Sequence, residues 1–204
     1  ADTYYAQAPV TVEVLGTMRG VRIARLDVAP VSYNPARNTI RVWEDVEFEI
    51  IFTNGDEALT SLQKEKYGSH YFEPVFRGML NYRPAESSSR DTISRYPVRY
   101  VIVSDPMFED QLQPLVEWKT KKGFDVVQAY TNDPNVGSTT YSIKAYLQSL
   151  YDNATPEEPA PTFVLFVGDI AQVPAWTGQA ASHVTDLYYV EYTNDLFPEI
   201  YYGR

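Results

Sequence analysis

The chain contains no cysteine, and this absence removes several kinds of chemistry. Within these 204 residues there can be no disulfide, no thiolate zinc site and no cysteine nucleophile. Histidine is also scarce, because only His70 and His183 occur, far apart and outside any recognisable catalytic motif. We therefore expect both to be surface or structural residues, and we predict no catalytic residue in this chain.

Long apolar runs and glycine-rich motifs are missing as well. No stretch of about 18 apolar residues occurs, so no transmembrane helix is predicted. The segment VGDIAQVP carries a single glycine, and neither GxGxxG nor GxxxxGK[ST] is present. A nucleotide-phosphate cradle is therefore unsupported.

Positive charge is scarce relative to negative charge. The chain has 17 Lys and Arg against 27 Asp and Glu, which gives a net charge of −10 and a pI near 4.7. Nucleic acid is an improbable partner, because phosphate binding needs a basic face. The acidity is compatible with a secreted protein or with cation binding. Hydrophobic residues make up 44%, enough for one or two folded domains.

The first fifty or so residues alternate apolar and polar side chains, a pattern typical of β-strands. Asn34-Pro35 and Asn38 supply turn chemistry between two of these segments. The segments are VTVEVLG (10–16), VRIARLDVAPV (21–31) and TIRVWEDVEFEIIF (39–52). We predict a meander or small sandwich of antiparallel strands.

Residues 54–96 change in character. The pattern predicts a short helix from Glu57 to Tyr67, and PAESSSRDTISRYP (84–97) has the composition of a linker. Arg83 and Arg90 lie in or beside it. An exposed linker with arginines is where a protease of basic specificity would cut. The alternative is a linker that is never cut.

The last hundred residues alternate strand and helix patterns, which predicts a parallel α/β sheet with right-handed crossovers. Sites in such sheets form beyond the carboxyl ends of the strands, and Asp169 follows the third strand directly. Asp169 is therefore a candidate ligand or site residue. The expected strands are 98–103, 124–130 and 163–167, and the expected helices are 108–123 and 139–151.

Two acidic residues, Asp195 and Glu199, lie four apart around Phe197-Pro198. Pro198 disfavours a helical Phe197, so we expect a loop. In a loop the carboxylates and the Phe197 carbonyl could converge, and calcium prefers such oxygen sets. The alternative interpretation is a solvated acidic loop.

Several motifs, in order, carry a family resemblance. VEVLGTMRGVRIA (12–24) with YNPARNTIRV, PVRYVIVSDPMFEDQLQPLVEWKTKKGF (97–124), VGSTTYSIKAYL (136–147), FVLFVGD (163–169) and VTDLYYVEYTNDLFPEIY (184–201) span essentially the whole chain. They resemble the gingipain-type cysteine peptidases (family C25), and most closely the lysine-specific branch.

The resemblance implies an α/β protein in three parts. Residues 1–60 would be the end of a β-rich, antiparallel prodomain, 61–96 a linker with the processing region, and 97–204 the start of a caspase-like peptidase domain with a parallel sheet. Processing cleavage in this linker would follow Arg83 or Arg90. Arg204 is a further expected processing site, because an arginine at this position suits cleavage by a trypsin-like activity. Arg90-Asp91 resembles the family's Arg-Asp junction, whereas Arg83 fits by its place after LNY.

The resemblance also implies a structural calcium ion. Its ligands would be the carboxylates of Asp169 and Glu199, Asp195, and backbone oxygens of Thr193 and Phe197. The lysine-specific relative has an acidic residue at the position of Thr193, a departure that a main-chain ligand would make harmless.

The expected function is that of the N-terminal portion of the zymogen of a secreted or cell-surface cysteine endopeptidase. Such an enzyme cleaves protein substrates after Lys or Arg. The family's catalytic His and Cys would lie beyond Arg204, in the C-terminal remainder of the peptidase, which would be this chain's partner. The chain alone is then expected to be inactive. The alternative is a non-catalytic inhibitory, chaperone or binding module.

Overall fold

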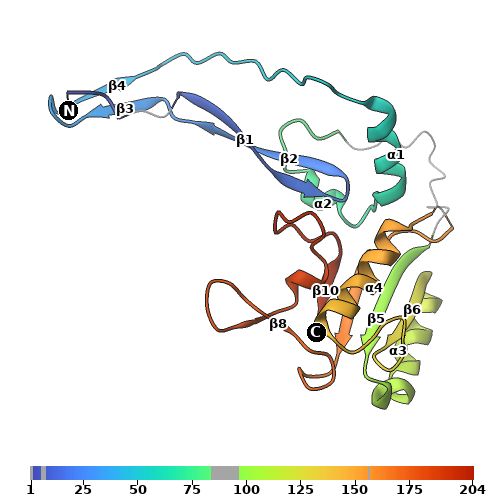
Figure 1. Ribbon diagram of the computed structural model, residues 1–204. Coiled ribbons are helices and arrows are strands. Elements are labelled where there is room, and N and C mark those ends of the chain that lie inside the picture. Colours follow the sequence, from blue (N-terminus) through green and yellow to red (C-terminus); the bar gives the residue numbers. More distant parts are fainter. Residues whose placement is uncertain (1, 6–7, 84–96, 156) are drawn as a thin grey trace.

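The computed structural model describes residues 2–5, 8–83, 97–155 and 157–204. Figure 1 shows β-hairpins at the N-terminal end, a short helical segment after them, and a parallel sheet with helices in the C-terminal half. This is the predicted mixed α/β class, with antiparallel strand pairs followed by a four-stranded parallel sheet.

The longest hairpin joins β1 (Val10–Met18) to β2 (Val21–Val28). The strands are antiparallel, and Met18 pairs with Val21, so only Arg19 and Gly20 form the turn. Both turn residues have positive φ, 52° and 75°. This is the pattern of a two-residue type I′ turn, whose twist matches that of the flanking strands. Glycine adopts this conformation freely, but for Arg19 it is an uncommon one.

A second hairpin pairs β3 (Val31–Asn34) with β4 (Thr39–Val42), as the turn chemistry predicts. The predicted strand over 39–52 is wrong beyond Val42, because the structure gives residues 43–52 no strand assignment. Alternation indicates which side chains share a face, but a strand forms only where a neighbour accepts its hydrogen bonds. Phe48 and Phe52 are accordingly 45% and 77% exposed.

The segment after this stretch is helical and packed. Helix α1 (Glu57–Tyr67) has the predicted bounds, and the side chain of Asp56 caps it by accepting a hydrogen bond from the Leu59 N–H at 2.9 Å. Helix α2 (Glu73–Phe76) follows. The boundary expected at residue 60 therefore falls inside α1. Phe72 is 1% exposed, so this part of the expected linker belongs to the folded structure.

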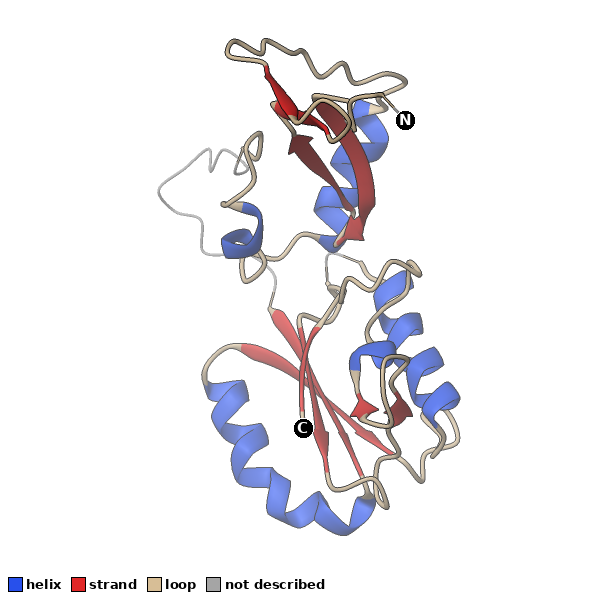
Figure 2. Ribbon diagram, turned by 90° about the vertical axis from the view of Figure 1, so that its left-hand side faces the viewer, coloured by secondary structure: helices blue, strands red, loops and turns tan. Residues whose placement is uncertain are grey.

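The parallel sheet has the strand order β10-β7-β5-β6. Its strands are β5 (Val98–Ser104), β6 (Phe124–Tyr130), β7 (Phe163–Val167) and β10 (Tyr201–Gly203). Helices α3 (Glu109–Lys121) and α4 (Thr140–Asp152) cover opposite faces of it (Figure 2). Right-handed crossovers produce this arrangement, because the chain moves from β5 to β6 and then back past β5 to β7. The three predicted strands and two predicted helices are confirmed.

Local capping explains where the two helices begin. The side chain of Asp105 accepts a hydrogen bond from the Met107 N–H at 2.9 Å at the start of the 3-10 turn η1 (Pro106–Phe108), which leads into α3. Thr139 and Ser142 form a reciprocal capping box at the start of α4. None of the described helices is long and apolar enough to cross a membrane.

Two buried clusters hold the chain together. The larger lies between α4 and the sheet, where Ile143 and Leu147 pack with Val101, Val164 and Phe166. Tyr189 of the 3-10 turn η2 (Leu187–Tyr189) belongs to this cluster, and Trp176 of β8 (Trp176–Thr177) packs against it. Strand β8 pairs with β9 (Val184–Thr185).

The smaller cluster joins the β1–β2 hairpin to the sheet through the helical segment. Its buried members are Met18, Phe72 and Phe76, with Phe197 and Tyr201 packed against them. The rings of Phe72 and Tyr201 stack with their centroids 4.2 Å apart. The tip of the hairpin therefore meets the sheet beside the start of β10.

Candidate functional site

The most heavily buried charged residues gather where the hairpin tip meets the loop before β10. Tyr201 pairs with Phe163 in parallel register, so Glu199 lies beside the amino end of β7. Glu199 is 1% exposed and Arg19 is 2% exposed. Buried charges need partners, because an isolated charge in a protein interior is strongly unfavourable.

The carboxylate of Glu199 receives two hydrogen bonds at one oxygen. The backbone N–H of Arg19 and the hydroxyl of Tyr151 donate to Oε2 at 2.5 and 2.7 Å. The guanidinium of Arg19 does not bond the carboxylate. Its Nη1 donates instead to the carbonyl oxygens of Pro161 and Glu199 at 2.7 and 3.0 Å. Backbone and side chain of one arginine therefore contact the same site.

Asp195 makes a second link to the hairpin. Its Oδ2 accepts a hydrogen bond from the Thr17 N–H at 2.6 Å, and its Oδ1 accepts one from the Phe197 N–H at 2.9 Å. A β-carbon at Gly16 would lie 2.3 Å from Oδ2 of Asp195, so only glycine permits this approach. The two carboxylates thus bind the backbone amides of residues 17 and 19.

Burial and hydrogen bonding shift the protonation equilibria of these groups in opposite directions. Burial raises the pKa of Glu199, although the Tyr151 hydroxyl and the Arg19 amide partly offset it. For Asp195 burial also acts upward, but hydrogen bonds from the Thr17 and Phe197 amides outweigh it and hold the pKa below the ordinary value. The pKa of Tyr151 is raised mainly by burial and, to a smaller extent, by the charge of Glu199, so Tyr151 remains a donor at neutral pH.

Asp169 is not part of this group, which corrects the expected convergence of five calcium ligands. It follows the carboxyl end of β7, whereas Glu199 lies at the amino end. The length of β7, five residues or roughly 17 Å, therefore lies between Asp169 and Glu199. Asp169 instead accepts a hydrogen bond from the Ile170 N–H at 2.8 Å.

The remaining members of the expected calcium set lie in one loop but are engaged by the hairpin. Thr193 contributes its hydroxyl to the Thr17 carbonyl at 3.4 Å, and Asp195 and Glu199 accept the amides described above. Across residues 2–5, 8–83, 97–155 and 157–204, no group of three or more His, Cys, Asp or Glu is placed to hold a metal ion. With the hairpin in place, the carboxylates of Asp195 and Glu199 already accept backbone hydrogen bonds, so we expect them not to bind calcium in this state.

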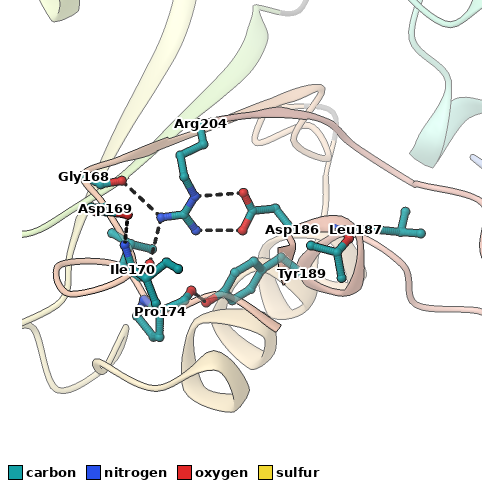
Figure 3. A network of polar contacts seen from close by, with 10 residues as sticks. Gly168, Asp169, Ile170, Pro174, Asp186, Leu187, Tyr189 and Arg204 are labelled. Atoms are coloured by element: carbon teal, nitrogen blue, oxygen red, sulfur yellow. Dashed lines mark hydrogen bonds and ion pairs between the residues drawn. The ribbon is translucent and has the colours of Figure 1, made fainter. Parts of the chain in front are cut away.

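A different network occupies the carboxyl end of the sheet (Figure 3). Nε and Nη2 of Arg204 donate to both carboxylate oxygens of Asp186 at 2.9 and 2.7 Å. Nη1 donates to the carbonyls of Val173 and Gly168 at 2.8 and 3.2 Å. The hydrogen bond with Asp186 raises the pKa of Arg204. Arg204 therefore joins the end of β10 to the loops after β7 and before η2.

The three arginines expected as processing residues have different surroundings. The guanidinium of Arg204 makes the four hydrogen bonds just described, whereas Arg83 is exposed. Arg83 also lines a cavity of about 290 Å³ beside Arg19 and Lys64. Arg90 lies outside the described residues.

Arg19 and Tyr151 are members of the buried group around Glu199 that sequence patterns did not reveal. A signal for Arg19 existed, since an Arg-Gly pair between two alternating segments indicates a two-residue turn. Nothing in the sequence indicated that Arg19 would be buried against Glu199, a residue 180 positions later in the chain.

Comparisons with known proteins place two family models side by side on this chain. Residues 2–75 match Propeptide_C25, and residues 93–204 match Peptidase family C25. Lys-gingipain of Porphyromonas gingivalis is 36% identical over 201 residues, which is 98% of this chain and 12% of that protein. Gingipain R1 of Porphyromonas gingivalis is 23% identical over 92% of this chain and 18% of its own length.

Two solved structures are also similar. "Structure of Protease" is 38% identical with a TM-score of 0.49, over 52% of this chain and 24% of that one. The crystal structure of the Arg-specific cysteine proteinase gingipain R is 25% identical with a TM-score of 0.45, over 60% of this chain and 26% of that one. The chain thus spans much less than two thirds of the relatives that it matches.

Proposed function

The chain belongs to peptidase family C25, and from this premise we propose that it is the N-terminal portion of the zymogen of a cysteine endopeptidase that cleaves after Lys or Arg. The catalytic His and Cys then belong to the remainder of the same peptidase, since no cysteine occurs among these residues. The 97–204 part is the first, caspase-like half of the peptidase domain, and the enzyme acts outside the cell on protein substrates.

The observation that carries this proposal is the order of the two family matches. A propeptide match over 2–75 and a peptidase match over 93–204 lie in one continuous chain. Between them runs the Ser-rich, charged stretch of residues 84–96. The hairpin of the propeptide part contacts the peptidase part through one buried and one partly buried hydrogen bond, as expected of a precursor whose two parts are folded together.

We place the processing cut at Arg90 or Arg83 rather than at Arg204. Cleavage after an arginine requires its side chain to enter the pocket of the cutting protease. Arg204 would first have to leave four hydrogen bonds, two of them with the Asp186 carboxylate. Arg90 ranks ahead of Arg83, because Arg83 precedes Pro84, whose ring restricts the backbone of the residue before it.

The test uses the precursor expressed with its downstream sequence. We expect a mature N-terminus at Asp91, hydrolysis of peptide amides after Lys or Arg, and loss of this hydrolysis on alkylation with iodoacetamide. Arg90→Gln should slow processing, and Arg95→Gln in the same stretch is the matched control. Hydrolysis that survives thiol alkylation, or no hydrolysis after basic residues, would refute the proposal.

The second candidate function, a non-catalytic inhibitory or chaperone module, is favoured by one observation. The hairpin donates two amide hydrogen bonds to carboxylates of the 97–204 part and one guanidinium hydrogen bond to its Pro161 carbonyl. The downstream reading frame separates the two candidates. A stop codon close to Arg204 supports the module, and a continuing frame that encodes a His-Gly motif and a cysteine supports the enzyme.

A further inference from the structure

The tip of the β1–β2 hairpin places one arginine between the propeptide part and the peptidase part. We propose that the peptidase part carries an arginine socket, a site that recognises a tight β-turn with arginine at its first central position. The socket consists of the carbonyls of Pro161 and Glu199, the carboxylate of Glu199 and the ring of Tyr151. Its occupant is the hairpin of residues 14–24. The proposal rests on the proposed function only in treating the two parts as separable.

The side-chain half of the socket suits a guanidinium. Nη1 of Arg19 donates to two carbonyl oxygens of the peptidase part, and the guanidinium carbon lies 5.4 Å from the ring centroid of Tyr151. The ring of Phe72, whose centroid is 5.2 Å away, also contacts the guanidinium but belongs to the propeptide part. A planar cation stacks between rings and donates in fixed directions, whereas an ammonium is a compact point charge. The socket should therefore discriminate arginine from lysine.

The backbone half of the socket suits a tight turn. In a two-residue hairpin the strand pairing ends at Met18 and Val21, which leaves the Arg19 amide free of the ladder. That amide donates to Glu199, and the Thr17 amide, two residues earlier, donates to Asp195. Arg19 has a φ of 52° here. An extended peptide holding arginine at negative φ would not direct side chain and amide to this one site.

The position of the socket defines its role. It lies at the amino ends of β7 and β10, whereas open α/β sheets build their binding sites beyond the carboxyl ends of the strands. An occupied socket therefore attaches the propeptide without using the edge where a substrate site would form. Glu199 is 1% exposed with the hairpin in place, and withdrawal of the hairpin removes the Arg19 amide and leaves the Tyr151 hydroxyl as the donor to the carboxylate. Dissociation must break this hydrogen bond to a buried carboxylate together with the two guanidinium–carbonyl bonds, and we expect this cost to make dissociation slow.

The inference predicts that a cut in residues 84–96 does not free the propeptide. The test uses the 204-residue chain with a recognition site for a sequence-specific protease placed in this stretch. After the cut, we expect the two fragments to co-elute in size-exclusion chromatography and to appear as one complex in native mass spectrometry. Arg19→Met should speed dissociation of the two fragments at least about 30-fold, and Arg19→Lys should give a dissociation rate between those of Arg19→Met and the parent chain. Arg22→Met alters an exposed arginine of the same hairpin and should leave the complex intact.

A peptide displacement experiment keeps the inference testable if Arg19→Met does not fold. A cyclised peptide of residues 14–24 in excess should displace the propeptide fragment from the cut parent chain, and the same peptide with Arg19→Met should not. Equal displacement by both peptides, or equal dissociation of the Arg19→Met and Arg22→Met chains, overturns the inference. Hydrolysis by the full precursor is measured separately, so loss of the socket and loss of the proposed peptidase activity are distinguished.

Discussion

Replacing Asp186 with asparagine should destabilise the α/β part by breaking the network at the carboxyl end of the sheet. Asp186 accepts two hydrogen bonds from Arg204, through Nε and Nη2, in a bidentate arrangement (Figure 3). Asparagine has the same shape but keeps only one oxygen, and its NH₂ group would face an N–H of the guanidinium. Arg204 would then keep its charge with a neutral partner.

The magnitude follows from the bonds that are lost and from their exposure. A hydrogen bond to a charged group contributes about 1.5–3 kcal/mol. Asp186→Asn removes one such bond and weakens the other. The side chains of Arg204 and Asp186 are 24% and 14% exposed, so solvent screens the pair in part. We expect the free energy of unfolding to fall by about 2 kcal/mol, less than the ~3–5 kcal/mol for breaking a fully buried pair.

Urea unfolding followed by tryptophan fluorescence measures this loss. For an m-value of about 2 kcal/mol/M, the midpoint should fall by about 1 M. The control is Glu117→Gln, which removes an exposed ion pair with Lys121 within α3 and should cost about 0.5 kcal/mol or less. If the two variants lose the same stability, the Arg204–Asp186 pair does not connect the loops as we argue.

Three further predictions concern the junction between the two parts. Phe72→Ala should cost about 3–5 kcal/mol in urea unfolding, because Phe72 is 1% exposed, whereas Phe52→Ala, at 77% exposure, should stay within about 0.5 kcal/mol; equal costs would contradict the packing. Burial, then a hydrogen bond with Glu73, raises the pKa of Tyr82 to about 12. The unfolded chain loses this proton near pH 10, so stability should fall as the pH rises from 10 to 12, and Tyr82→Phe should flatten that fall. Calcium should not raise the thermal unfolding temperature of the intact chain above its value in the presence of a chelator. A gain of about 2.7 kcal/mol in the free energy of unfolding at saturating calcium would show that the calcium site forms even with the hairpin in place.

Local signals in the sequence predicted most of the α/β part. The strand at Phe163–Val167 is a continuous apolar run because both of its faces are covered, and such a run needs no knowledge of the partner strands. The beginning of α4 was equally local, since Thr139 and Ser142 cap it within one turn. These features depend on residues three or four positions apart.

The strand expected over residues 43–52 failed for the opposite reason. Alternating Phe48, Ile50 and Phe52 describe a face, but no local signal says whether another strand lies beside it. Among the described residues, the pairing of this hairpin ends at Val31 with Val42. A pattern of period two therefore predicts a side-chain arrangement and leaves the pairing partner undetermined.

The grouping of Asp169 with Glu199 fails because of β10, a strand that was not among the three predicted from the sequence. In a parallel sheet all strands run in one direction, so a residue that follows one strand and a residue that precedes another lie at opposite ends. Asp169 follows β7 and Glu199 precedes β10, which is parallel to β7. The order of the motifs along the chain did not reveal this, because it does not show at which end of the sheet each residue lies.

The same reasoning explains why the two ends of this sheet hold arginines in different ways. At the carboxyl end, Arg204 and Asp186 belong to the same part of the chain, so their contact persists whatever happens to the hairpin. At the amino end, Arg19 comes from the propeptide part, and its guanidinium bonds carbonyl oxygens while its amide bonds the Glu199 carboxylate. Only the second contact can be broken by separating the two parts. A cut after Arg90 removes the covalent connection and leaves these hydrogen bonds in place, so release of the propeptide is a second step governed by Arg19 and Glu199.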